Sequence, residues 1–434
     1  MTTQIRNLRA VLSQSEHDFG VMLGKVLSPS QPLNSEEFLR GREQQLAGIK
    51  RALFQPGRHV LIHGLRGVGK SSLAQTAAYS LSIGADPIIV GCDGNSTFGR
   101  LMREVFDEAV NKNPTIEKKI KEVGGGFSRL GINFGGKVTT HEASATEPGS
   151  VNEAIRLVQF LCEAYSERPV VVIDEFDQVR DQTEQEYFTN FIKQVSDKHV
   201  PACFLFCGIG ESVDAIMSAH GSADRYFHTV SLGQLPWEAR FEIVTGAAER
   251  LGIETEENTV IRIARISDGF PHYVHFISEK LFWRVYEAHN DGKVTGELFE
   301  LAMNDASEAM DMKLRGPYET ATQKYNNDYE AVLWAAADGH ELRRRSSDIY
   351  ESYLRIMQNR PQEALNREKF NQRINSLKRP SHASILSGTR AGWYEFTEKM
   401  IRGYVRLRAE QEGIVLEVDH PAIKLRTRSF PQPA

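Results

Sequence analysis

The sequence predicts an α/β protein with a parallel sheet, followed by an all-helical segment and a smaller C-terminal domain. Three observations predict this class. Five short apolar runs alternate with segments of helical periodicity. A glycine-rich loop separates the first of these runs from the helix that follows it. After Pro236 the apolar runs stop, and helical periodicity continues to residue 312.

The five apolar runs are short, rich in β-branched and aromatic residues and bounded by turn-forming or charged residues, which is typical of buried strands. Because they are interleaved with helices, they predict a parallel sheet with helices on both faces. A further helix is expected before the first strand, over residues 38–57. The expected strands are residues 59–63, 87–92, 169–174, 203–209 and 227–232.

The chain of 434 residues is long enough for several domains. The alternation of strand and helix is interrupted over residues 113–150, where the glycine-rich stretch 124–138 predicts a β-hairpin insertion. The expected parts are an N-terminal helix and arm (1–35), an α/β core (36–235), a helical lid (236–318), a C-terminal domain (319–413) and a flexible tail (414–434).

Composition predicts a cytoplasmic protein without a membrane partner. No apolar run approaches the roughly 18 residues that a membrane span needs. The N-terminus lacks the apolar stretch and cleavage site of a secretory signal. The four cysteines form no C-x-x-C pair, which favours buried thiols over a zinc site.

The net charge of −5 conceals an asymmetry along the chain. Residues 341–434 carry 18 Lys and Arg against 11 Asp and Glu, a balance of +7, so residues 1–340 carry −12. A basic end on an acidic body favours an anionic partner for that end. The alternative is a solvated basic surface without a partner.

The sequence G-L-R-G-V-G-K-S fits the pattern G-x-x-x-x-G-K-[ST] and lies between a predicted strand and a predicted helix. Its glycines can turn backbone N–H groups toward one point, where they form an anion cavity with the helix N-terminus. Lys70 adds a charge between the β- and γ-phosphates of ATP, and Ser71 offers a hydroxyl to Mg²⁺. The predicted nucleotide-binding residues of this loop are Gly64, Leu65, Arg66, Gly67, Val68, Gly69, Lys70, Ser71 and Ser72.

The acidic motif V-V-V-I-D-E at residues 170–175 supplies carboxylates for hydrolysis. Asp174 ends a predicted strand and is expected to hold the Mg²⁺ shell, while Glu175 is expected to polarise the attacking water. Asp177 is expected to cap the next helix. A pair of helix-capping acids is the alternative for the motif itself. The pattern predicts a P-loop ATP hydrolase in which Lys70 and Glu175 are catalytic.

The segment F-L-R-G-R-E (38–43), the P-loop, the I-D-E strand end and the helical lid together resemble the AAA+ superfamily. More narrowly, they resemble its origin-recognition-like and STAND-like branches. The resemblance covers residues 36–312 and implies an Mg-ATP site between the α/β core and the lid.

The resemblance implies three further site residues, each with a structural alternative. Arg42 contacts the base or ribose, or is a surface charge at a helix start. Arg225 reaches the γ-phosphate bound by a neighbouring subunit, or forms a surface salt bridge. His272 replaces a lid arginine and contacts phosphate when protonated, or is a packed lid histidine. After the fourth strand, Glu211 or Ser212 has to serve as the polar sensor.

The C-terminal domain has the segment lengths of a winged helix, with the second of its three helices expected over 343–358. Its basic third helix and wing suit contacts to phosphates and a major groove. The alternative is a packing module, with Arg402, Arg406 and Arg408 of the last helix facing solvent or a partner. The predicted nucleic-acid contacts are Arg367, Lys369, Arg373, Lys378, Arg379 and Arg390.

Together these features predict an ATPase that acts as a nucleotide-dependent assembly switch, forms a homo-oligomer and engages nucleic acid such as DNA. A second hypothesis is a signalling or antiviral-defence ATPase that regulates a partner effector such as a nuclease. A small-molecule P-loop kinase ranks last, because a kinase does not need the basic C-terminal appendage.

Overall fold

The computed structural model of this protein divides by its internal contacts into two compact units. One comprises Met1–Gln31 and Gln234–Ala434, and the other comprises Pro32–Gly233. We call them the helical unit and the α/β unit, and the chain passes between them twice. The described residues are 12, 14–82, 85–113, 116, 146–165, 168–209, 223–289, 291–310, 312–322, 328–358, 360–389 and 392–416.

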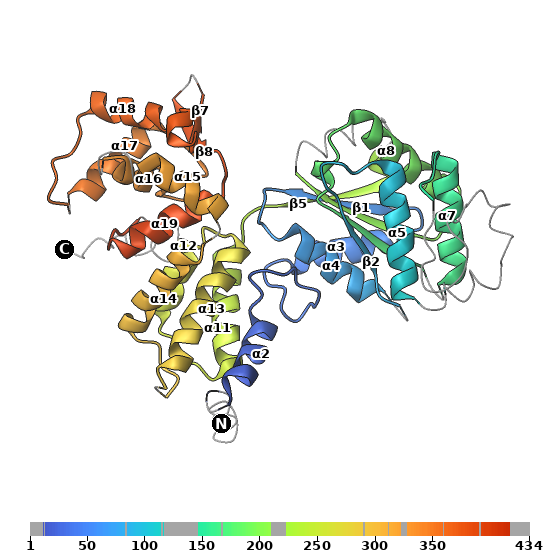
Figure 1. The fold of residues 1–434 in the computed structure, drawn as a ribbon, viewed down its shortest axis with the longest axis horizontal. Helices are drawn as coiled ribbons and strands as arrows, with labels where there is room; N and C mark the ends of the chain where they lie inside the picture. Colours follow the sequence, from blue (N-terminus) through green and yellow to red (C-terminus); the bar gives the residue numbers. More distant parts are fainter. Residues whose placement is uncertain are drawn as a thin grey trace, which may run out of the picture. The chain divides into compact units, whose positions relative to one another are not determined.

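A five-stranded parallel sheet forms the centre of the α/β unit, in the order β2-β3-β4-β1-β5 (Figure 1). All five strands lie where the apolar runs predict them. The sheet is covered on both faces, so Val60, Leu61 and Ile62 of β1 are fully buried. The strands are β1 (His59–Gly64), β2 (Ile88–Gly91), β3 (Val170–Asp174), β4 (Cys203–Gly208) and β5 (Phe227–Leu232).

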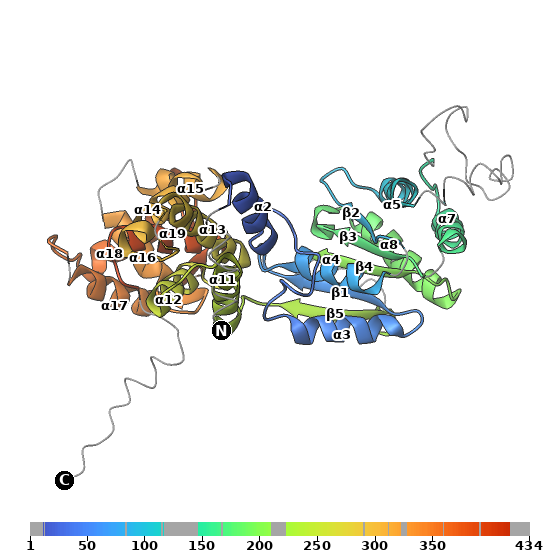
Figure 2. The same cartoon turned by 90° about the horizontal axis from the view of Figure 1, so that it is seen from below.

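Helices cover both faces of this sheet, as crossovers between parallel strands require. Helices α3 and α4 pack together on one face, and α5, α7 and α8 pack together on the other (Figure 2). The helices of this unit are α3 (Glu43–Phe54), α4 (Lys70–Leu81), α5 (Phe98–Lys112), α7 (Val151–Ala164), the 3₁₀ turn η2 (Phe176–Gln178), α8 (Gln182–Asp197) and α10 (Ala223–Tyr226).

The helix expected over residues 38–57 begins only at Glu43. Gly41 takes a left-handed φ of 67°, and Arg42 occupies the N-cap position. This turn leaves the segment before Arg42 outside the helix, and it carries the Arg42 side chain to the site described below. The insertion predicted over 124–138 lies outside the described residues.

The prediction that Asp177 caps the helix after β3 is wrong. That helix is capped by Asp181, whose carboxylate accepts hydrogen bonds from the N–H groups of Thr183 and Glu184. Asp177 lies instead in η2, directly after the acidic motif.

The four helices predicted after Pro236 are present, and helix α2 packs with them. We call these four helices the lid, and their role as a lid remains a prediction. Phe19 of α2 is fully buried and stacks on Tyr286, with ring centroids 4.3 Å apart. It also meets Trp283 edge-on at 5.1 Å. These helices are α2 (Glu16–Val26), α11 (Trp237–Leu251), α12 (Glu257–Ile266), α13 (Pro271–Glu287) and α14 (Gly296–Glu308).

The rest of the helical unit combines helices with a small antiparallel sheet in the order β6-β8-β7. The sequence prediction missed β6: the helix expected over 343–358 begins at Ser346, because Arg343–Arg345 pair with β8. The elements are α15 (Met312–Thr322), α16 (Asp328–Ala337), β6 (Arg343–Arg345), α17 (Ser346–Met357), α18 (Arg367–Ser376), η3 (Pro380–His382), β7 (Leu386–Gly388), β8 (Trp393–Phe396) and α19 (Ile401–Gln411).

Two further observations concern membrane spans and thiols. None of the helices in the described ranges has both the length and the apolar character for crossing a membrane. Cys92, Cys203 and Cys207 are buried, as predicted, and Cys162 is partly exposed.

Candidate nucleotide site

The loop between β1 and α4 has the backbone that its glycine pattern predicts. Gly64, Gly67 and Gly69 have φ angles of 155°, 78° and 93°, which residues with a side chain rarely adopt. A Cβ at Gly64 would also lie 2.2 Å from the carbonyl oxygen of Leu232 at the end of β5. Gly69 precedes α4 without a side-chain cap, so the first N–H groups of this helix can bind an anion.

The ammonium group of Lys70 contacts only neutral oxygens of this loop. Its Nζ donates to the main-chain carbonyls of Gly64 and Leu65 at 3.1 and 3.0 Å. Burial lowers the pKa of this ammonium group, and the charges of Asp177 and Asp174 offset part of that shift. Within the described part of the chain it has no ion pair. A half-buried cation held by carbonyls alone is suited to receive an anionic ligand.

The acidic motif lies at the carboxyl edge of the sheet, like the glycine loop, because β3 and β1 both pair in parallel with β4. One carboxylate oxygen of Asp174 accepts a hydrogen bond from the N–H of Glu175 at 2.9 Å. Glu175 is exposed and has a φ of 53°, a conformation that costs a residue with a side chain about 1–3 kcal/mol. Strain of this kind is concentrated at functional sites, which favours a functional role for Glu175.

Ser71 and Asp174 offer the hydroxyl and carboxylate oxygens that Mg²⁺ prefers. Ser71 is half-buried in the first turn of α4. Nowhere in the described ranges do three or more His, Cys, Asp or Glu form a group that could hold a metal ion. The donor set therefore fits Mg²⁺ that is held by two protein oxygens together with the phosphates of a nucleotide.

Arg42 is a buried support of the loop. Its Nη2 donates to the carbonyls of Val68, in the glycine loop, and Gly233, just after β5, at 3.1 and 2.6 Å. Burial lowers the pKa of its guanidinium, and its Nε is buried without a partner. The alternative of a surface charge does not hold, since the residue is only 5% exposed. The predicted contact to base or ribose remains a prediction.

The side chain of Ser72 forms a hydrogen bond with Leu33, in the segment before α3, and its predicted contact to nucleotide remains a prediction. Its Oγ accepts a hydrogen bond from the N–H of Leu33 at 3.1 Å, and the hydroxyl of Thr76 donates to the carbonyl of Leu33 at 3.2 Å. These two hydrogen bonds hold Leu33 against the first turns of α4. Among the other predicted loop residues, Arg66 is exposed and Val68 is fully buried.

Arg225 and His272 belong to different units, and their predicted phosphate contacts remain predictions. Arg225 is exposed in α10, and its carbonyl accepts a hydrogen bond from Arg58 at 3.0 Å. His272 opens α13, where its Nδ1 lies 2.9 Å from the carbonyl of Pro29 and its ring stacks on Phe276. Glu211 and Ser212 lie outside the described residues.

A second cationic centre, which the sequence did not predict, lies in the helical unit. Arg402 and Arg406 of α19 are 1% and 7% exposed, so the expectation that they face solvent or a partner is wrong. Both pair with one carboxylate oxygen of the buried Asp268, at 3.3 and 3.0 Å. Arg402 also donates to the carbonyl of Gly339 at 2.5 Å, and Arg406 donates to that of Ala337 at 2.9 Å. Burial lowers the pKa of Arg402 to about 9.

This centre joins the lid to the C-terminal helices. Asp268 lies in the turn between α12 and α13 and has a left-handed φ of 51°. The next residue, Gly269, accepts a hydrogen bond from the N–H of Leu235 at 2.7 Å. A Cβ at Gly403 of α19 would lie 2.5 Å from the ring of Tyr273, so only glycine permits this approach of α19 to α13.

The predicted nucleic-acid residues of α18 divide into two groups. Arg367 donates to the carbonyl and hydroxyl oxygens of Ser346, both at 3.1 Å, and Arg373 pairs with Asp328 at 3.3 Å. These contacts hold both side chains against neighbouring elements of the domain.

The remaining predicted contacts are more open. Lys369 and Arg379 are exposed, and Lys378 is half-buried, with its ammonium 5.4 Å from the ring centre of Tyr394. Arg390 lies outside the described residues.

Comparison with known proteins agrees with this site. Residues 39–205 match the family model of the AAA ATPase domain. The chain is similar to the Walker-type ATPase PABY2304 of Pyrococcus abyssi at 18% identity and a TM-score of 0.49, over 87% of this chain and 98% of that one. It is also similar to the Aeropyrum pernix ORC1 protein in complex with DNA (15%, 0.43, 86% and 93%). A third similar structure is the Thermotoga maritima RuvB Holliday junction branch migration motor (14%, 0.42, 88% and 98%). No curated protein matches the chain.

The glycine loop, the half-buried lysine and the acidic strand end, on a parallel sheet of this order, define a P-loop nucleotide-binding domain. Residues 39–205 match the AAA ATPase domain and contain the glycine loop, Lys70 and Asp174, so this part of the chain is assigned to a P-loop ATPase domain. This assignment rests on the family model and on the site itself, because the identities and TM-scores of the solved structures are too low to carry it. The branch of the superfamily remains a prediction.

Proposed function

We propose that this ATPase is a nucleotide-controlled switch that assembles with copies of itself and engages nucleic acid through its C-terminal domain. The observation that carries the proposal is the set of contacts of Lys70, whose ammonium donates to two carbonyls and forms no ion pair with any described residue. A bound triphosphate would supply that counter-ion and so change the contacts of the loop. Mg²⁺, held by Ser71 and Asp174, would neutralise phosphate charge, and Glu175 would orient the attacking water.

The assembly part of the proposal is tested by the mass of the protein in solution. We expect a larger species with a non-hydrolysable ATP analogue than with ADP. If Arg225 acts on the nucleotide of a neighbouring subunit, Arg225→Ala should lower turnover per subunit while ATP binding persists. A mass that is the same with both nucleotides would contradict the assembly switch.

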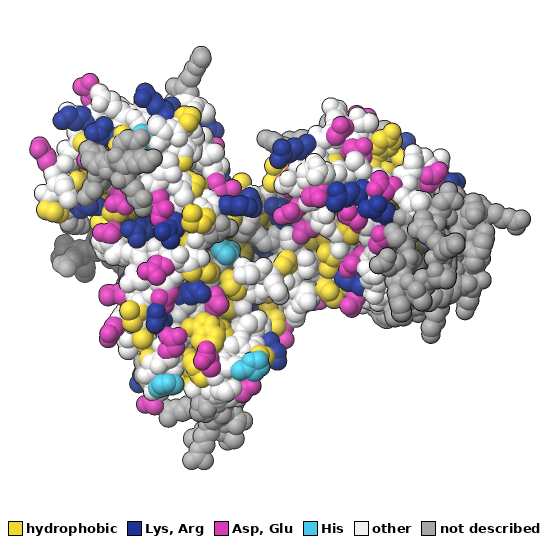
Figure 3. Space-filling view, in the orientation of Figure 1, with side chains coloured by type: hydrophobic (Ala, Val, Ile, Leu, Met, Phe, Trp, Pro, Cys, Tyr) yellow, Lys and Arg dark blue, Asp and Glu magenta, His cyan; other side chains and the backbone are white. Residues whose placement is uncertain are grey.

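The order of elements in the C-terminal domain supports its winged-helix interpretation: helix, short strand, two helices and a strand pair. Arg343 and Arg345 are exposed, and their guanidinium groups lie 5.5 and 4.9 Å from the ring centre of Trp393. Cations beside an aromatic ring suit phosphates and bases. Lys and Arg are interspersed with Asp and Glu over the face in Figure 3, so contact has to depend on such local clusters.

A gel-shift titration with duplex DNA at low and high salt tests the nucleic-acid part. The double variant Arg343→Ala, Arg345→Ala should weaken DNA binding about tenfold. It should also make the affinity less dependent on salt, because fewer counter-ions are released on binding when phosphate contacts are lost. Lys293→Ala in the lid, an exposed residue outside the C-terminal domain, is the matched control. Absence of any shift at low salt would refute the proposal.

The second hypothesis, regulation of a partner effector, is favoured by the internal contacts of Arg367, Arg373, Arg402 and Arg406. Side chains that hold the domain together are not available to a nucleic acid. Under this hypothesis the gel shift is negative, and a pull-down recovers an effector such as a nuclease only with ATP.

A further inference from the structure

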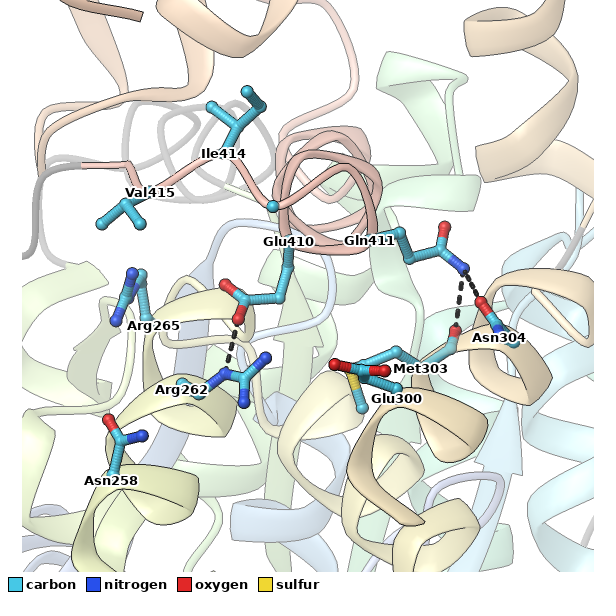
Figure 4. A pocket seen from close by; sticks show the side chains of 11 residues that line it. Asn258, Arg262, Arg265, Glu300, Met303, Asn304, Glu410, Gln411, Ile414 and Val415 are labelled. Carbon is cyan, nitrogen blue, oxygen red and sulfur yellow. Dashed lines mark hydrogen bonds and ion pairs between the residues drawn. The ribbon is translucent and has the colours of Figure 1, made fainter. Parts of the chain in front are cut away.

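A cavity of about 460 Å³ lies inside the helical unit, between α12, α14 and the end of α19 (Figure 4). Asn258, Arg262 and Arg265 reach it from α12, where their spacing places them on one face of the helix. The left-handed residue Gly413 ends α19 and turns Ile414 and Val415 toward the same space. Every lining residue belongs to the helical unit, whereas the glycine loop belongs to the α/β unit.

Two arginines of this cavity differ in their partners. The Nε of Arg262 pairs with the carboxylate of Glu410 at 2.6 Å, and its guanidinium lies 4.0 Å from the ring centre of Phe299. Arg265 makes no side-chain hydrogen bond or ion pair to the described part of the chain, and its Nε is fully buried. A buried donor without an acceptor is costly and calls for an explanation.

The other walls of the cavity are fixed and chemically mixed. Gln411 donates to the carbonyl of Met303 at 3.3 Å and to the side-chain oxygen of Asn304 at 2.9 Å, which ties α19 to α14. The side chain of Val415 is 69% exposed and makes an apolar rim, and the exposed Glu300 offers an acceptor. Such a wall suits a ligand with an apolar body and N–H or O–H donors.

We propose that this cavity binds a small organic oxyanion, whose carboxylate or phosphate pairs with Arg265 and whose body lies against Met303, Ile414 and Val415. The guanidinium group matches an oxyanion in charge and in hydrogen-bond geometry. The volume lies in the range of small-molecule sites. Of the two lining carboxylates, Glu410 is paired with Arg262, which reduces its repulsion of an anion, and Glu300 is exposed to solvent.

The ligand would act on the junction between the lid and the C-terminal helices. The main-chain carbonyl of Arg265 accepts a hydrogen bond from Arg406 at 2.9 Å, so the cavity adjoins the buried centre around Asp268. A bound ligand therefore stabilises this junction and raises the melting temperature of the helical unit.

The test uses the full chain carrying Lys70→Ala, so that phosphate groups do not occupy the glycine loop. Phenyl phosphate and benzoate are titrated by calorimetry, with inorganic phosphate as the probe without an apolar body. We expect one site per chain for at least one organic probe, bound more tightly than inorganic phosphate. Arg265→Met should weaken that binding about tenfold or more. Arg51→Met in α3, which changes an exposed arginine outside the cavity, should leave it the same.

Melting of the same variants separates binding from folding. Arg265→Met should leave the melting temperature of the ligand-free protein unchanged or raised, because it removes a buried Nε donor that has no acceptor. The proposal is overturned if neither organic probe binds, or if binding survives Arg265→Met.

Discussion

The α/β unit and the helical unit each enclose a cationic centre, and the two centres differ in what faces the charge. Lys70 in the α/β unit contacts two neutral carbonyls and has no ion pair with a described residue. Arg402 and Arg406 in the helical unit share the buried carboxylate of Asp268 and are further held by carbonyls.

This difference separates a binding site from a structural junction. A buried cation that has its counter-ion inside the protein stabilises one packing arrangement, and removing one partner leaves an uncompensated charge. A half-buried cation whose hydrogen bonds go to carbonyls, and which has no ion pair with a described residue, gains more when an anion arrives from outside. By this criterion we expect Lys70 to bind an anionic ligand, whereas the Asp268 centre holds α19 against the turn between α12 and α13.

The largest expected effect concerns chemistry at the first centre. Glu175→Gln should lower ATP turnover by about 10²–10⁴-fold, the usual contribution of a positioned general base, while ATP affinity stays close to that of the unchanged protein. Steady-state phosphate release and equilibrium ATP binding measure the two quantities. Unchanged turnover would remove Glu175 from its assigned role.

The next effect concerns stability at the second centre. Asp268→Asn leaves two buried guanidinium groups without a counter-ion and should lower the free energy of unfolding by about 3–5 kcal/mol. All four tryptophans, Trp237, Trp283, Trp334 and Trp393, lie in the helical unit, so the tryptophan fluorescence of urea-unfolded samples reports this unit alone.

The matched control is Asp305→Asn, which breaks a pair of Asp305 with Arg284 whose side chains are 30% and 34% exposed. A partly exposed pair should contribute about 1 kcal/mol or less. Equal losses in the two variants would mean that burial of the Asp268 centre does not matter.

A smaller effect concerns how the stability of the helical unit depends on pH. Burial lowers the pKa of His275 to about 4, against an ordinary value of 6.5. Between these values the unfolded chain binds a proton that the folded chain does not. The stability of the helical unit should therefore be complete above pH 6.5 and fall by up to about 1.4 kcal/mol per pH unit on acidification toward pH 4.

His275→Gln should remove most of that slope from the tryptophan transition. In the α/β unit, burial lowers the pKa of His59 to about 3, so the same sign holds there. His59→Gln is the control, because it should leave the tryptophan transition of the helical unit unaltered. A slope that persists in His275→Gln would assign the effect to other groups.

The sheet and the glycine loop were predictable because their determinants are local. Short apolar runs specify β1 to β5, and the three glycines and Lys70 stand together in the sequence. The helix start at Glu43 and the strand β6 were not predictable, because each depends on a partner that is distant in the sequence. Arg42 donates a hydrogen bond to the carbonyl of Gly233, and β6 pairs with β8.

The buried arginines were the least predictable feature. Arginines on a helix usually face solvent, as was expected of Arg402 and Arg406. Their partner Asp268 lies more than a hundred residues earlier in the chain. The only local signal is that the two arginines are four residues apart and therefore share a face of α19. Arg367 and Arg373 show the same limit: a basic helix predicts charge but not whether the charge faces inward.

The most direct test of this account compares Lys70→Met with Arg406→Met in one pair of assays. Mg-ATP affinity is measured by calorimetry, and unfolding of the helical unit by tryptophan fluorescence. We predict that Lys70→Met abolishes the heat of ATP binding and leaves the unfolding transition in place. Arg406→Met should instead lower the unfolding midpoint and still bind ATP. ATP binding that survives Lys70→Met would contradict the account, as would an unfolding midpoint that Arg406→Met does not change.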